Sequence, residues 1–229
     1  DATIATMKNF GVTVQTLIPY KKYSIAPQVY KPSTFTVPMD FSSLALLLSA
    51  SVLNGENVII HGRMGNLPQG DKVFIDILEQ LGVKVSIKED QITIQSPKEL
   101  NGGRFDLSNS PDLLPPLAIL ALKTINPIEI INVKHARLKE TDRILILSRE
   151  LVKIGIRVQE KEDGLILESP NESKGATLNS ENDHRLFMAF CIAGMYVGNC
   201  VVTDHESVAV SYPDFINEMN RLGAKILVQ

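Results

Sequence analysis

The sequence has 229 residues, of which 44% are hydrophobic and 21% are charged, and its formal net charge is −3. This balance fits a soluble globular protein with a sizeable core, and the lack of a basic excess argues against nucleic-acid binding. No uncharged apolar run reaches about 18 residues, so no membrane span is predicted. The chain begins at Asp1 without Met, and we expect it to be part of a longer protein with no secretory signal here.

One phrase recurs four times along the chain, and each copy predicts a helix end, a glycine and a strand. The glycines of the four copies are 71, 73 and 68 residues apart: Gly11, Gly82, Gly155 and Gly223. Glycine is the usual residue in the left-handed conformation that ends a helix. Such self-similarity predicts repeated structural units.

Each unit is expected to begin with a short strand, followed by a helix that is apolar on nearly all sides. The first strands are predicted at Thr34–Val37, Arg104–Leu107 and Ala176–Leu178. The helices are predicted at Phe41–Val52, Leu113–Leu122 and Leu186–Val197. A helix without a polar face belongs in the interior. We therefore expect three buried, parallel helices.

A second strand, an amphipathic helix and a hairpin complete the expected unit. The second strands are predicted at Asn57–His61, Pro127–Val133 and Asn199–Thr203. The hairpins pair Val83–Ile87 with Gln91–Gln95 and Ile156–Gln159 with Leu165–Glu168, and the third unit ends on one strand, Ala224–Val228. The predicted fold class is therefore α/β, built from β-α-β-α-β-β units.

The domain organisation follows from these units. The three units span about residues 37–97, 103–169 and 175–229 and form one domain, 37–229. Residues 1–36 hold a helix and two strands, Thr13–Ile18 and Tyr23–Ala26, and are expected to end a preceding domain.

Aspartates precede the predicted helices at the repeat spacing. Asp40, Asp112 and Asp183 precede the buried helices, and Asp71, Asp142 and Asp214 open the outer ones. Helix capping explains most of them, and we assign that role to Asp71 and Asp214. If the buried helices begin at one face, their N-termini would attract an anion there.

Residues 137–143 hold five formal charges, between an apolar strand and an amphipathic helix. One interpretation is a solvated first turn capped by Thr141 or Asp142. The other is an anion site to which Lys139 and Arg143 contribute, with Glu140 as a functional carboxylate.

Residues 182–185, Asn-Asp-His-Arg, precede the last buried helix. Arg185 is unfavourable at a helix start, which an anionic ligand explains better than fold stability, although a salt bridge is an alternative. Arg143 and Arg185 would then clamp a phosphate or carboxylate. Asp112 and Glu140 would supply a general base and a general acid, and His184 is interpreted as a supporting residue.

Metal and cofactor motifs are not found in the sequence. Cys191 and Cys200 lie in apolar segments without metal-ligand spacing, and we expect them to be reduced core residues of a cytoplasmic protein. No glycine-rich phosphate loop of the P-loop or dinucleotide type occurs. We therefore expect neither a metal nor a cofactor.

Four segments resemble, in order and spacing, the C-terminal half of the EPSP synthase family: Ser110–Asp112, Arg137–Arg143, Asn182–Arg185 and Ser211–Phe215. The resemblance covers the whole chain and implies the enolpyruvyl transferase fold, with two domains of three β-α-β-α-β-β units. It implies a cytoplasmic, monomeric 3-phosphoshikimate 1-carboxyvinyltransferase of the shikimate pathway, which leads to chorismate and the aromatic amino acids. Such enzymes transfer the enolpyruvyl group of phosphoenolpyruvate to the 5-hydroxyl of shikimate 3-phosphate.

The resemblance also implies roles for single residues. Asp112 matches the carboxylate that takes the hydroxyl proton, and Glu140 matches the residue that protonates the methylene carbon and later removes a proton. Lys139 matches a contact to the shikimate ring or its phosphate. Arg143 and Arg185 match the clamp on phosphoenolpyruvate, with Asp183 and His184 beside them. Val210 stands where many members have a lysine. Because the N-terminal half of the family is missing, we expect this chain alone to be inactive.

Two other readings stay open at this stage. One is the sister enzyme that transfers enolpyruvyl to UDP-N-acetylglucosamine, against which the Lys-Glu-Thr-Asp-Arg string argues. The other is a non-enzymatic, anion-binding repeat domain. In that case Asp112, Glu140, Arg143 and Arg185 would be dispersed surface charges.

Overall fold

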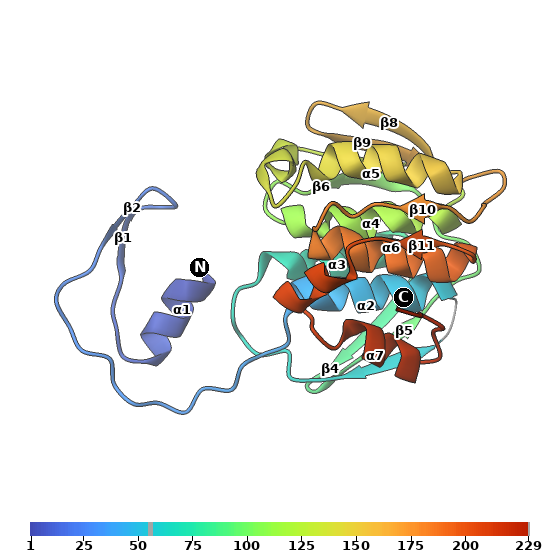
Figure 1. The fold of residues 1–229 in the computed structure, drawn as a ribbon. Coiled ribbons are helices and arrows are strands. Elements are labelled where there is room, and N and C mark those ends of the chain that lie inside the picture. The colour runs from blue at the N-terminus through green and yellow to red at the C-terminus, as the bar shows by residue number, and fades with distance from the viewer. Residues whose placement is uncertain (55–56, 229) are drawn as a thin grey trace.

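Three mutually packed helices form the centre of the main body in the computed structural model, which describes residues 1–54 and 57–228 (Figure 1). They are α2 (Phe41–Asn54), α4 (Leu114–Ile119) and α6 (His184–Val197). Every residue of α4 is buried, and α2 and α6 bury most of theirs. The prediction of three buried helices is thus confirmed, and the reason is their lack of a polar face.

The middle helix is less regular than the sequence pattern predicts. The predicted helix Leu113–Leu122 is a 3₁₀ helix (Pro111–Leu113), then α4, then a second 3₁₀ helix (Leu120–Lys123). Pro115 and Pro116 stand in the first turn of α4. Proline donates no backbone hydrogen bond, so it is tolerated in that turn, where the N–H groups have no partner within the helix.

Each unit contributes its own sheet. The first sheet is antiparallel in the order β3 (Val58–His61), β5 (Gln91–Gln95), β4 (Lys84–Lys88). The second has the order β6 (Gly103–Asp106), β7 (Ile128–Ile131), β9 (Gly164–Glu168), β8 (Arg157–Lys161), with only β6 and β7 parallel. The third pairs β10 (Thr177–Leu178) with β11 (Val201–Val202) in parallel. The middle unit therefore contains the whole predicted pattern.

The outer helices are α3 (Phe74–Gln80), α5 (Arg143–Leu151) and α7 (Phe215–Arg221). The apolar stripe that makes the predicted amphipathic helix around α5 is fully buried: Ile144, Leu147, Leu151 and Ile154. The four repeated glycines have φ values of 79°, 92°, 102° and 103°, which confirms the predicted left-handed helix ends.

Two predicted strands are wrong. Thr34–Val37 and Ala224–Val228 pair with no strand of the described chain, and Val37 and Leu227 are 78% and 83% exposed. Instead of joining a ladder, the backbone of Ile226 exchanges two hydrogen bonds with the side-chain amide of Asn220, at 2.8 and 2.9 Å. Gln229, the last residue of the expected third unit, lies outside the described residues, as do residues 55 and 56 of the first.

The N-terminal segment lies apart from the main body (Figure 1). It contains α1 (Ala2–Asn9) and the antiparallel pair β1 (Gln15–Ile18) and β2 (Lys22–Ser24). None of the helices within residues 1–54 and 57–228 combines the length and the apolar composition that crossing a bilayer requires.

Candidate functional site

The guanidinium of Arg143 is fully buried and joins three carboxylates. Nε donates to Asp183 Oδ2 at 2.7 Å, and Nη1 donates to Asp112 Oδ1 at 2.8 Å. Nη2 donates to Glu140 Oε2 at 2.6 Å and to Asp183 Oδ1 at 3.3 Å. A charge at this depth requires paired, hydrogen-bonding partners, and these carboxylates provide them.

Asp112 connects Arg143 to two further cations. Its Oδ1 lies 3.3 Å from Lys139 Nζ, and its Oδ2 lies 3.3 Å from Arg185 Nη2. Burial by itself would raise the pKa of Asp112, but the charges of Arg185, Arg143 and Lys139 outweigh burial and hold that pKa below its usual value. Asp112 is therefore an ionised carboxylate among three cations. Together with Glu140 and Asp183, these residues form what we name the Arg143 cluster.

Helix capping positions both residues of the ion pair between Arg143 and Asp183. Asp142 caps α5 because its Oδ1 accepts the N–H of Leu145 at 3.0 Å, which places Arg143 in the first turn. Thr141 does not cap this helix; its hydroxyl donates to Asp183 Oδ2 at 3.2 Å. Asp183 in turn caps α6, whose Arg185 N–H lies 2.9 Å from Oδ1.

The structure brings six of the seven predicted site residues into one cluster of hydrogen bonds and ion pairs: Asp112, Lys139, Glu140, Arg143, Asp183 and Arg185. The dispersed arrangement expected of a non-enzymatic repeat domain is not found. His184, the seventh, is buried at the start of α6, and burial lowers its pKa. The charge at the α6 start has a protein partner, because Arg185 pairs with Asp112.

Arg143 differs in one respect from the clamp that the sequence suggests. Its four hydrogen bonds to carboxylates leave its side chain with no exposed surface. An anion that reaches Arg143 must therefore displace Asp112 or Glu140. Glu140 is the more mobile candidate on chemical grounds, since its side chain is 46% exposed and Arg143 is its one hydrogen-bond partner within the described residues.

Asp71 lies close enough to the Arg143 cluster for the charges of Asp112 and Arg185 to act on it. The prediction that Asp71 caps a helix is wrong. It caps neither the 3₁₀ helix Gly70–Val73 nor α3, and instead accepts a hydrogen bond from the hydroxyl of Ser42. Burial raises its pKa; the Ser42 hydrogen bond opposes this, and the nearby charge of Asp112 adds to it. Gly70 could have signalled the location, because a Cβ there would lie 2.8 Å from the backbone oxygen of Asn109. Asp214 begins α7 but makes no capping hydrogen bond.

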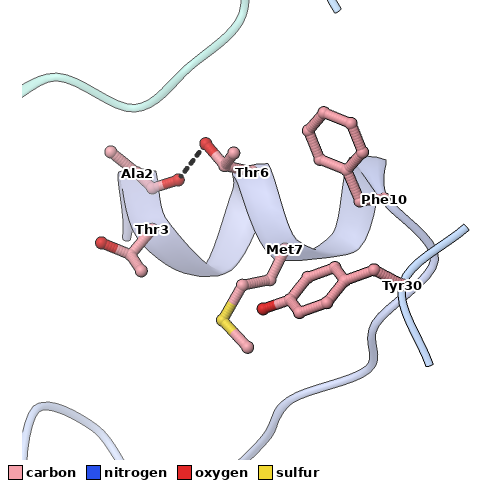
Figure 2. A pocket seen from close by; sticks show the side chains of 6 residues that line it. All are labelled: Ala2, Thr3, Thr6, Met7, Phe10 and Tyr30. Atoms are coloured by element: carbon pink, nitrogen blue, oxygen red, sulfur yellow. Dashed lines mark hydrogen bonds between the residues drawn. The ribbon is translucent and has the colours of Figure 1, made fainter. Parts of the chain in front are cut away.

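Two hollows lie at the N-terminal side of the molecule. One, of about 400 Å³, is lined within the N-terminal segment by Ala2, Thr3, Thr6, Met7, Phe10 and Tyr30 (Figure 2). It contains no residue of the Arg143 cluster. The other, of about 410 Å³, lies between that segment and the main body, where Tyr20 faces Ser42, Asp71 and Asn109. It therefore borders the cluster through Asp71.

Comparison with known proteins gives a consistent result. The family model described as EPSP synthase (3-phosphoshikimate 1-carboxyvinyltransferase) matches residues 1–219. A 3-phosphoshikimate 1-carboxyvinyltransferase from Nitrosopumilus maritimus is 78% identical over 226 residues, which are 99% of this chain and 54% of that protein. One from Methanococcus maripaludis strain S2 is 38% identical, across 100% of this chain and 54% of that protein. The chain thus spans about half the length of the curated relatives it matches.

Solved structures agree with the sequence comparison. An EPSP synthase structure from Acinetobacter baumannii matches with a TM-score of 0.85 and 26% identity, covering 100% of this chain and 56% of that one. The enolpyruvyl transferase NikO from Streptomyces tendae shares the fold, with a TM-score of 0.76 and 21% identity, covering 97% of this chain and 52% of that one. The chain has the enolpyruvyl transferase fold and belongs to the EPSP synthase family.

Proposed function

We propose that this chain supplies half of the active site of a 3-phosphoshikimate 1-carboxyvinyltransferase. In this proposal residues 37–229 are its C-terminal domain, and residues 1–36 end the preceding N-terminal domain. The observation that carries the proposal is the buried Arg143, which draws Asp112, Glu140 and Asp183 to one point beside Arg185 and Lys139. Membership of the family supports the choice of phosphoenolpyruvate and shikimate 3-phosphate as substrates.

The charges suit a reaction between two anionic substrates. Arg143, Arg185 and Lys139 would hold phosphate and carboxylate groups, with Asp183 and His184 keeping the arginines in place. Each of these side chains that pairs with a substrate anion gives up its ion pair with Asp112. Because these cations hold the pKa of Asp112 down, substrate binding would raise it and make Asp112 a stronger base when the hydroxyl is present.

The reaction requires three proton transfers, two in the addition and one in the elimination, and two carboxylates are in position to assist them. Asp112 would take the proton of the 5-hydroxyl as its oxygen bonds to the central carbon of phosphoenolpyruvate. Glu140 would give a proton to the methylene carbon in this addition. In the elimination Glu140 would take a proton back from the methyl group as the bond to phosphate breaks, and the proton on Asp112 would leave with the phosphate or pass to water. Its 46% exposed side chain leaves it accessible to a ligand.

One expected cation is missing from this half of the site. Val210, where many family members have a lysine, is 75% exposed and contributes no charge. We propose that contacts to the phosphate of phosphoenolpyruvate come from Arg185 and from residues of the remaining half.

A chimaera tests the proposal directly. The matching segment of the Nitrosopumilus maritimus relative is replaced by this chain, a substitution that 78% identity makes conservative. We expect phosphate release from phosphoenolpyruvate that depends on shikimate 3-phosphate, and none from the 229-residue chain alone. A folded chimaera that is inactive beside an active parent would refute the proposal. Turnover with UDP-N-acetylglucosamine instead would favour the sister reaction.

A further inference from the structure

A turn at residues 180–183 with a left-handed backbone leads into Asp183, His184 and Arg185 at the Arg143 cluster. Glu181 and Asn182 are consecutive residues with φ values of 51° and 61°, and neither is glycine. The N–H of Asp183 bonds to the oxygen of Ser180 at 3.0 Å, which closes a turn with two left-handed central residues. Side chains other than Asn and Gly are disfavoured in such positions, so surrounding contacts must hold the turn.

Side chains outside this turn accept hydrogen bonds from its backbone and from the residue that precedes it. The N–H of Asn179 donates to Glu150 Oε2 of α5 at 2.8 Å, and the N–H of Glu181 donates to Asn179 Oδ1 at 2.9 Å. The N–H of Asn182 donates to Asp204 Oδ2 at 3.3 Å. Asp204 therefore holds the second of the two left-handed residues.

Asp204 also binds the first residue of the turn. Its Oδ2 lies 3.2 Å from the hydroxyl of the fully buried Ser180, which is also 3.1 Å from the backbone oxygen of Thr203, and 2.9 Å from Thr203 Oγ1. Asp204 follows β11 and has a φ of 66° itself, so its carboxylate reaches back toward the turn from a left-handed backbone. Its three hydrogen bonds all go to the turn or to its neighbouring strand end.

We propose that Asp204 is a positioning residue of the site: through the turn 180–183 it holds Asp183 in place, and through Asp183 it holds Arg143. The chain of contacts is continuous, since Asp183 leaves the turn and accepts from Arg143 Nε at 2.7 Å. Asp204 itself touches no residue of the Arg143 cluster among its hydrogen bonds. Its effect on catalysis rests on the proposed function, whereas its effect on Arg143 does not.

Hydrogen exchange of the Arg143 side chain tests the structural part in the 229-residue chain. Asp204→Gly removes the carboxylate but tolerates the left-handed backbone, so it isolates the side-chain contribution. We expect the Nε–H of Arg143 and the N–H of Asn182 to exchange at least about tenfold faster, because a hydrogen bond to a charged group is lost. Asp204→Asn retains an acceptor oxygen and should change exchange less than about threefold.

Two comparisons separate positioning from general loss of stability. The N–H of Leu48, buried in α2, reports global unfolding, and its exchange should accelerate less than that of Arg143 in Asp204→Gly. Asp214→Gly is a surface control, because the carboxylate of this exposed aspartate makes no capping bond and accepts from the Asn217 side chain, and it should leave Arg143 unchanged. Equal acceleration at Leu48 and Arg143, or none at Arg143, would overturn the proposal.

Relief of the turn strain gives a second, independent test. In Glu181→Gly the left-handed backbone costs little, so the turn depends less on Asp204. The double variant Asp204→Gly/Glu181→Gly should therefore regain at least half of the lost Arg143 protection on a logarithmic scale. Purely additive effects of the two changes would contradict the role of Asp204 in holding this turn.

The chimaera described above extends the test to function. Asp204→Gly should raise KM for phosphoenolpyruvate about tenfold or more while changing KM for shikimate 3-phosphate much less, and Asp204→Asn should restore it. An equal rise in both KM values would overturn the positioning role toward Arg143. If the chimaera has no activity at all, the proposed function fails, while the exchange result still decides the role of Asp204.

Discussion

Arg137 and Arg143 are six positions apart in the same charged segment, yet their surroundings differ. Arg137 donates to Asp142 and Glu160 and to the backbone oxygens of Lys161 and Glu162, so most of its partners lie at the end of β8 or in the turn that follows it. Its side chain is 21% exposed. Arg143 is fully buried, and its partners come from the segments that precede α4, α5 and α6.

The contrast assigns different tasks to two arginines of one motif. Arg137 joins the α5 start to a hairpin of its own unit and uses two backbone oxygens, which carry no net charge, as well as two carboxylates. Arg143 joins two units and uses only carboxylates, which a substrate anion could replace. A cation exchangeable between protein and ligand is what an anion site requires. Within the charged segment 137–143, Arg137 therefore stabilises the fold, and Arg143 belongs to the candidate site.

The largest expected effect is loss of the buried cation. Arg143→Met keeps the volume but leaves the fully buried Asp183 with no cation, and removing one partner of a buried pair costs about 3–5 kcal/mol. Denaturant unfolding of the 229-residue chain measures this. The double variant Arg143→Met/Asp183→Asn should recover part of the loss. A loss below about 1 kcal/mol would show that Arg143 is not a buried partner of Asp183.

Asp112→Asn should act on catalysis more than on the fold. Without the general base we expect kcat of the chimaera to fall by at least about 100-fold, measured by phosphate release. The pKa of Asp112 is lowered, so its ionised form stabilises the fold above the usual carboxylate range, and this contribution is lost as the pH falls through the lowered value. Acid unfolding of Asp112→Asn should lack that contribution. Unchanged kcat would remove Asp112 from the mechanism.

Arg137→Met is the matched surface variant, and its effect should be smaller. Its ion pairs with Asp142 and Glu160 are partly exposed, so we expect a loss of about 1 kcal/mol in unfolding free energy. The KM for phosphoenolpyruvate in the chimaera should remain that of the unchanged protein. A large rise in KM would contradict the separation of framework and site.

Asp71→Asn should have the smallest effect, and its sign should be opposite. Because the pKa of Asp71 is raised, folding favours its protonated form, and that stability is lost as the pH rises through the raised value. Asn cannot ionise, so the variant should be slightly more stable than the unchanged chain at neutral pH, with the difference shrinking in mild acid. Denaturant midpoints at both pH values measure this. A variant that is less stable at neutral pH would contradict the assigned cause.

The repeat made much of the fold predictable. Gly11, Gly82, Gly155 and Gly223 mark helix ends because few other residues accept positive φ, and the all-apolar helices must lie inside. Thr34–Val37 and Ala224–Val228 failed because an alternating pattern indicates a face but supplies no neighbouring strand. No local pattern contains that information.

The residues of the site were predictable, but the hydrogen bonds and ion pairs between them were less so. Asp112, Arg143 and Asp183 could be selected because they stand at helix starts that the repeat brings to one face. Saturation of Arg143 by three carboxylates depends on side-chain distances between units, which the order of residues does not give. Asp71 was misassigned for a similar reason: aspartate at a helix start usually caps, and only the close approach at Gly70 distinguishes this case.

The central claim is that the cation of Arg143 can pass from protein carboxylates to a substrate anion. The most direct measurement is the side-chain ¹⁵Nε resonance of Arg143 in the chimaera during titration with phosphoenolpyruvate, with Arg137 as the internal reference. We expect a saturable shift of the Arg143 resonance while that of Arg137 stays fixed. Binding detected elsewhere in the protein without any shift at Arg143 would contradict it.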